Sequence, residues 1–126
     1  MSRAGVDVHL LPRVSLPEYL GVAGLADAVL DSFDFSGGMT TIQLLTAGIP
    51  IVSYPGPFMR GRMAMPFLRQ AGADSLIAGT EEEFVDLACD TSRIIAAAEK
   101  LQPDGLFRDL NPVRALDEFL LGLPGT

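Results

Sequence analysis

The stretch from Ala28 to Gln43, AVLDSFDFSGGMTTIQ, combines residue types that could hold an anion. An apolar run typical of a buried strand is followed by the pair Gly37-Gly38, by Thr40 and Thr41, and by an apolar segment typical of a helix. Glycines allow a tight turn, and the first turn of a helix leaves N–H groups unpaired where the helix dipole favours negative charge. The spacing therefore predicts a phosphate site, and the alternative is an ordinary strand–turn–helix connection whose glycines serve only the turn.

Several further motifs stand around this loop in a fixed order. They are Asp27, Leu30-Asp31, Ser36-Gly37-Gly38-Met39-Thr40-Thr41, Gly48-Ile49-Pro50, Pro55-Gly56 and Gly61-Arg62. This order resembles the C-terminal catalytic half of the O-linked N-acetylglucosamine transferase (SPINDLY-like) family, whose loop is of the type Asn-Gly-Gly-Thr-Thr-Thr. The resemblance runs from about Val6 to the end of the sequence, so it is more specific than the glycine loop alone.

The resemblance implies the C-terminal lobe of a GT-B glycosyltransferase, which transfers a sugar, expected to be N-acetylglucosamine, from a UDP-linked donor to protein serine or threonine. It implies that residues 1–126 form a single domain, a partial nucleotide-binding lobe of a longer enzyme. No metal or other cofactor is expected, and the nucleotide sugar is the substrate. The groove that binds the acceptor protein would lie in the other lobe and in N-terminal helical repeats, and the family's diphosphate-binding lysine would lie upstream of Met1. The piece alone is therefore expected to be inactive. The alternative is a non-catalytic Rossmann-like module that binds a nucleotide or a protein.

The diphosphate part of the implied site falls on the glycine loop. Carried over by position, Gly37, Gly38, Thr40 and Thr41 would line the diphosphate. Met39 departs from the family pattern, which has threonine there, so a hydroxyl is lost while the backbone N–H remains.

The nucleoside part of the implied site is more scattered. Gln43 stands where the family commonly has an acidic residue that binds the ribose, and its alternative is a solvated helix position. Tyr19 would lie against the base or serve as a core tyrosine. Val14 would face the base edge through its backbone, and Leu16 replaces a lysine of some members. Arg62 would contact phosphate or form a structural ion pair.

Composition limits the other functions that this chain could have. Its 126 residues fit one domain, 48% of them are apolar, and the net charge of −7 argues against a nucleic-acid surface. Cys89 is the only cysteine, so we expect it to pack as a small hydrophobe rather than in an internal disulfide. His9 has no cluster of metal ligands around it, and no apolar run has the length of a membrane span. We therefore expect a cytoplasmic protein without a membrane partner.

The hydrophobic pattern alternates between strands and helices. Strands are predicted at residues 6–11, 28–30, 50–54 and 75–78, and helices at 16–26, 40–47, 62–70, 80–101 and from 111 onward. The helix ends are indicated by Ser15 or Leu16 near the first cap, Gly48 as a stop, the capping box Thr80 to Glu83 and the start Asn111-Pro112. Residues 1–5 resemble the end of a helix from an upstream unit. The expected fold is α/β, a Rossmann-like parallel sheet of about four strands with helices on both faces and the ligand at the carboxyl ends of the strands. One open edge of this sheet could support a homo-oligomer.

The apolar spacing also predicts which faces of two helices are buried. The long helix is expected to bury Phe84, Leu87, Ala88, Thr91, Ile95 and Ala98, and the last helix to bury Leu116, Phe119 and Leu120. Asp27, Asp31 and Asp34 could suggest a carboxylate pair or a metal site. We expect Asp27 and Asp31 instead to mark a helix end and a strand end.

Overall fold

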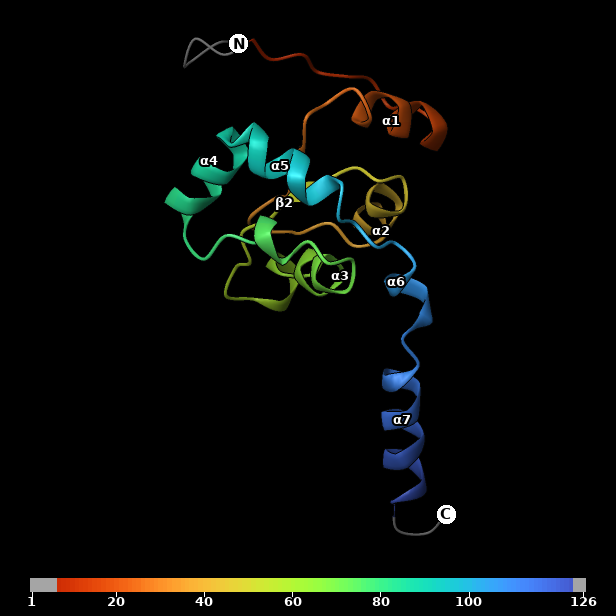
Figure 1. The fold of residues 1–126 in the computed structure, drawn as a ribbon. Coiled ribbons are helices and arrows are strands. Elements are labelled where there is room, and N and C mark those ends of the chain that lie inside the picture. The colour runs from red at the N-terminus through yellow and green to blue at the C-terminus, as the bar shows by residue number, and fades with distance from the viewer. Residues whose placement is uncertain (1–6, 124–126) are drawn as a thin grey trace.

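The computed structural model describes residues 7–123, so the expected helix end at residues 1–5 lies outside the described residues. Figure 1 shows short helices grouped around a small sheet, with the last helix extending away from this body. The elements are α1 (Leu16–Ala23), β1 (Val29–Leu30), α2 (Met39–Thr46), β2 (Ile51–Val52), η1 (Met59–Gly61), α3 (Ala64–Gln70), η2 (Asp74–Leu76), α4 (Glu81–Cys89), α5 (Thr91–Ala98), α6 (Gly105–Arg108) and α7 (Asn111–Leu121).

The sheet is parallel, as predicted, but smaller than predicted. β1 pairs with β2 in the register Val29 to Ile51 and Leu30 to Val52, and a single parallel bridge joins Ser53 to Ile77. The predicted strand at residues 6–11 is wrong over its described part, because residues 7–11 have no neighbouring strand to supply hydrogen bonds. The strand predicted at 75–78 is reduced to that bridge, since the preceding backbone is wound into the 3₁₀ turn η2.

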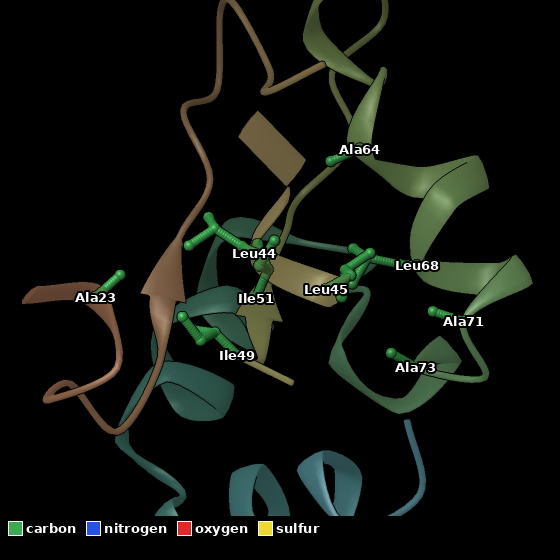
Figure 2. Packing of buried hydrophobic residues seen from close by; sticks show 9 residues of the cluster. All are labelled: Ala23, Leu44, Leu45, Ile49, Ile51, Ala64, Leu68, Ala71 and Ala73. Atoms are coloured by element: carbon green, nitrogen blue, oxygen red, sulfur yellow. The ribbon is translucent and has the colours of Figure 1, made fainter. Parts of the chain in front are cut away.

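Strand β2 is buried on both faces, which explains its continuous apolar sequence. Ile51 packs into a cluster with Leu44 and Leu45 of α2 and Leu68 of α3, and Figure 2 shows these side chains meeting at the centre of the cluster. Val52 points the other way, into a second cluster built mainly from α4 and α5. Helices therefore cover both faces, and the predicted α/β class is confirmed.

The long helix predicted over 80–101 is in fact two helices, α4 and α5, that break at Asp90. Thr80 caps α4 by accepting from the Glu83 N–H at 3.1 Å, as its capping-box sequence predicted. Asp90 has non-helical backbone angles and caps α5 by accepting from the Arg93 N–H at 3.0 Å.

The break shifts the buried face of α5 by one position. Ile94 and Ala97 are buried, whereas the predicted Ile95 is exposed. Phe84 and Leu87, which precede the break, are buried as predicted.

Helix α7 forms where Asn111-Pro112 predicted it, but its predicted inward packing is wrong. All of its residues are exposed, and Figure 1 shows it pointing away from the sheet, so no described element covers its apolar face. Cys89 is also exposed rather than packed, because it stands at the end of α4 just before the break. Within residues 7–123, no helix is both long and apolar enough to cross a membrane.

Candidate functional site

Two adjoining hollows lie beside the start of α2, and the first of them is at the carboxyl end of β1, where we expected the ligand. The first, here called the loop hollow, measures about 320 Å³ and is lined by the residues after β1, the glycine loop and the start of α2. The second, the Arg13 hollow, measures about 530 Å³ and is lined by Arg13, Val14, Leu16, Tyr19, Thr40 and Gln43. Tyr19 and Thr40 line both hollows, so the two lie side by side.

The loop hollow opens on the N-terminus of α2. Gly38 is the residue before the helix and has no capping side chain, and the first backbone bond runs from the Ile42 N–H to the Gly38 carbonyl at 3.3 Å. The N–H groups of Met39, Thr40 and Thr41 make no hydrogen bond to any other residue within 7–123. Unpaired amides at a helix start favour a negatively charged ligand.

The two threonines of the loop have different surroundings. Thr41 is 2% exposed, and its hydroxyl donates to the Gly37 carbonyl at 2.8 Å, so it fastens the loop to the helix. Thr40 is exposed, and its hydroxyl has no partner among the described residues. Of the pair, Thr40 is therefore the one whose hydroxyl is free to donate to a ligand.

Asp31, at the end of β1, is bound to the loop and to the next strand. Its carboxylate accepts hydrogen bonds from the Ser36 hydroxyl, the Gly37 N–H and the Ser53 hydroxyl. Ser36 and Ser53 are buried. Within residues 7–123 no group of three or more His, Cys, Asp or Glu side chains could hold a metal ion, and His9 lies apart from both hollows, with Asp7 as its partner at 3.0 Å.

Helix α1 brings Tyr19 to the hollows. Ser15 precedes the helix, and both its hydroxyl and its N–H donate to the Glu18 carboxylate, at 2.7 and 2.8 Å. Both bonds lower the pKa of Glu18, and the bond from the Ser15 hydroxyl has the larger effect. Pro17 stands in the first turn, where its missing N–H costs nothing.

Seven of the nine predicted site residues line these hollows. They are Val14, Tyr19, Gly37, Gly38, Thr40, Thr41 and Gln43. Met39 is 67% exposed and lines neither hollow with its side chain. Arg62 lines a separate apolar hollow with Met63 and Phe67, and it forms no ion pair with any other described residue.

Arg13 lines the second hollow, and the sequence analysis did not single it out. It is the cation of the Arg13 hollow, two residues before the start of the capping motif of α1. Its signal in the sequence is its position directly before Val14, which the resemblance places at the base edge.

The chain is similar in sequence to parts of much longer plant proteins. No family model matches the chain. It is 32% identical over 120 residues to a Hordeum vulgare protein named "Probable UDP-N-acetylglucosamine--peptide N-acetylglucosaminyltransferase SPINDLY", and 31% identical over 120 residues to the Arabidopsis thaliana protein of the same name. Each comparison covers 92% of this chain, which spans 12% and 13% of the length of these two relatives.

A solved structure agrees with these sequence matches. A mutant of the O-GlcNAc transferase of Thermobaculum terrenum superposes with a TM-score of 0.66 and 28% sequence identity, over 88% of this chain and 22% of that one. The predicted resemblance and the predicted fold class are thereby confirmed. The chain is therefore similar to one short part of much longer proteins named as SPINDLY-type N-acetylglucosaminyltransferases, and it shares the α/β fold of the corresponding part of a GT-B O-GlcNAc transferase.

Proposed function

We propose that this chain is the donor-nucleotide part of a glycosyltransferase that transfers a sugar, N-acetylglucosamine, from a UDP-linked donor to serine or threonine of a protein. The observation that carries the proposal is the set of unpaired amides at the start of α2, beside the loop hollow. Tyr19 and Thr40 line this hollow and also the neighbouring Arg13 hollow. A diphosphate fits the amides, and the nucleoside fits the larger neighbouring hollow.

Each proposed contact follows from the chemistry of the group. The amides of Met39 and Thr40, with the Thr40 hydroxyl, would donate to the diphosphate. The carboxamide of Gln43 would bond the ribose hydroxyls, as donor or as acceptor. The Tyr19 ring would lie against the base, and the Arg13 guanidinium would add positive charge to a chain whose net charge is −7.

In the whole enzyme, the serine or threonine oxygen would bond to the anomeric carbon while the bond from that carbon to the UDP oxygen breaks. Negative charge then grows on the diphosphate, and the start of α2 would stabilise it there. The proton of the acceptor hydroxyl needs a base. Neither hollow offers one from its described side chains, since Asp31 accepts three hydrogen bonds and His9 lies elsewhere.

Calorimetric titration of the 126-residue chain with UDP, UDP-N-acetylglucosamine, GDP and uridine tests the proposal. UDP should bind more tightly than uridine, because only UDP carries the diphosphate, and GDP tests whether the base is read. Equal affinities for UDP and uridine, or no saturable binding of any nucleotide, would contradict the proposal.

A binding module without catalysis is the second candidate, favoured by the exposed Met39, which supplies no hydroxyl where the family pattern has threonine. The two candidates agree that the isolated chain binds without transferring sugar. They differ in the parent protein, where release of UDP in the presence of an acceptor peptide supports the transferase and binding without release supports the module.

A further inference from the structure

Asp31 lies at a junction of three segments that are distant in the sequence. Its Oδ2 accepts from the Ser36 hydroxyl at 2.6 Å and from the Ser53 hydroxyl at 2.7 Å, and its Oδ1 accepts from the Gly37 N–H at 2.9 Å. Ser53 follows β2, and Ser36 and Gly37 belong to the loop. One carboxylate therefore joins the end of β1 to the end of β2 and to the glycine loop.

The same junction extends to α3. The Ser36 hydroxyl, 1% exposed, donates to Asp31 and also accepts from the Ala64 N–H at 2.9 Å, at the start of α3. The loop is thus held to the ends of β1 and β2 and to the start of α3 by buried and partly buried hydrogen bonds. Ser36 occupies the first position of the loop motif, where the family pattern has asparagine.

Gly37 connects Asp31 to α2 through two hydrogen bonds. Its N–H points to Asp31, while its carbonyl accepts the Thr41 hydroxyl at 2.8 Å, so both polar groups of Gly37 are occupied within the protein. The N–H groups that follow, of Gly38, Met39, Thr40 and Thr41, make no hydrogen bond to any other described residue. The bond to Asp31 therefore occupies the Gly37 N–H and fixes the backbone directly before the unpaired amides of α2.

We propose that Asp31 is a positioning residue of the donor site, which holds the glycine loop so that the start of α2 can receive the diphosphate. This inference rests on the proposed function. A carboxylate that lines a hollow for an anion would by itself repel that anion. Its presence is explained by the three donors that it organises, whose positive hydrogens offset its charge.

The direction in which one substitution changes the UDP affinity distinguishes positioning of the loop from repulsion of the diphosphate. Asp31→Asn keeps the shape but has one acceptor oxygen in place of two and adds donors, so it cannot keep all three bonds. If Asp31 positions the loop, UDP affinity falls by about tenfold or more, the effect of one hydrogen bond to a charged group, while uridine affinity changes little. If Asp31 only repelled the diphosphate, the same substitution would strengthen UDP binding.

Asp34→Asn is the matched control. Asp34 is exposed in the same loop and has no hydrogen bond or ion pair to another described residue, so its substitution removes the same charge without removing a bond. UDP binding should be unchanged or slightly stronger. Ser53→Ala, which removes one donor from the junction, is a milder variant that keeps the test open if Asp31→Asn does not fold.

The experiment measures UDP and uridine affinities of the 126-residue chain by calorimetry, with thermal unfolding of each variant alongside. A selective loss for UDP in Asp31→Asn, and a smaller one in Ser53→Ala, supports the inference. An unchanged ratio of the two affinities, whether both stay constant or both fall together, would overturn it while leaving the proposed function intact. Absence of UDP binding in the unsubstituted chain would instead overturn the proposed function.

Discussion

Thr40 and Thr41 are adjacent in sequence and alike in chemistry, yet the structure assigns them different tasks. The Thr41 hydroxyl is bound to the Gly37 carbonyl, and the Thr40 hydroxyl is open to both hollows. The sequence could predict that this pair follows a helix start. It could not predict which hydroxyl turns inward, because that depends on where the loop carbonyl lies in space.

The pair therefore gives a prediction with its own control. Thr40→Val should weaken UDP binding by about 1.5–3 kcal/mol, the value of a hydrogen bond to a charged group, and leave the free energy of unfolding nearly unchanged. Thr41→Val should instead lower the free energy of unfolding by about 1–3 kcal/mol, since the Gly37 carbonyl loses its partner. Calorimetry and urea denaturation separate the two effects, and a reversal of the two roles would refute the assignment.

Gly37 is required for the space it leaves. A Cβ built at this position would stand 2.6 Å from the Thr41 Oγ1, closer than real contacts allow. Gly37→Ala should therefore displace the Thr41 hydroxyl, lower the free energy of unfolding by about 1–3 kcal/mol and weaken UDP binding.

Gly21→Ala in α1 is the control for a glycine-to-alanine change. A Cβ there meets no atom within 4 Å, and alanine should stabilise the helix by about 0.5–1 kcal/mol. Both free energies come from urea denaturation. A gain of stability in both variants would mean that the space at Gly37 is not required.

At the scale of elements, helix α1 carries Tyr19 to the site and depends on its first turn. The bonds from Ser15 hold the pKa of Glu18 below its ordinary value of 4.5. A lowered folded-state pKa means that this stabilisation is complete above about pH 4.5 and is lost as the pH falls through the folded-state value.

Hydrogen exchange of the α1 amides should therefore quicken when the pH falls through this range, after correction for the intrinsic exchange rate. Glu18→Gln should exchange faster at neutral pH and should lack the added pH dependence. Unchanged protection across the acid range in the unsubstituted chain would show that the Ser15–Glu18 bonds do not hold the start of α1.

Local sequence signals predicted the elements best where they depend on neighbouring residues. The caps at Ser15 and Thr80, the stop at Gly48 with its positive φ of 76°, and the opening of α7 by Pro112 are of this kind. The break at Asp90 was missed because the apolar spacing continues across it with a shift of one residue. The Asp31–Ser53 bond, which spans 22 positions, has no local signal at all.

At the scale of the whole molecule, the body and α7 should contribute unequally to stability. Leu68 is fully buried in the cluster of Figure 2, so Leu68→Ala should cost about 2–5 kcal/mol of unfolding free energy. Phe119 on α7 is 64% exposed, and Phe119→Ser should change that free energy by less than about 0.5 kcal/mol. A comparable loss in both variants, measured by urea denaturation, would show that α7 packs against the body in solution.

The sequence also predicted an open sheet edge that could support a homo-oligomer, and this stays a prediction. β1 lies at one edge of the sheet, and Leu30 on it is exposed. The edge is only two residues long, so it offers few backbone groups to a second copy. The exposed apolar face of α7 could not be foreseen from periodicity, since an amphipathic pattern states that a face is apolar but not what covers it.

The central claim is that a nucleoside diphosphate binds at the start of α2, and amide shifts during a UDP titration of the ¹⁵N-labelled chain test it most directly. The largest shifts should fall on Gly38, Met39 and Thr40, with smaller ones on Gln43 and Tyr19 and none on α7. Uridine should move Tyr19 and Gln43 while leaving the loop amides nearly still. Shifts that concentrate on α4, α5 or α7, or loop amides that respond to uridine as strongly as to UDP, would contradict the account.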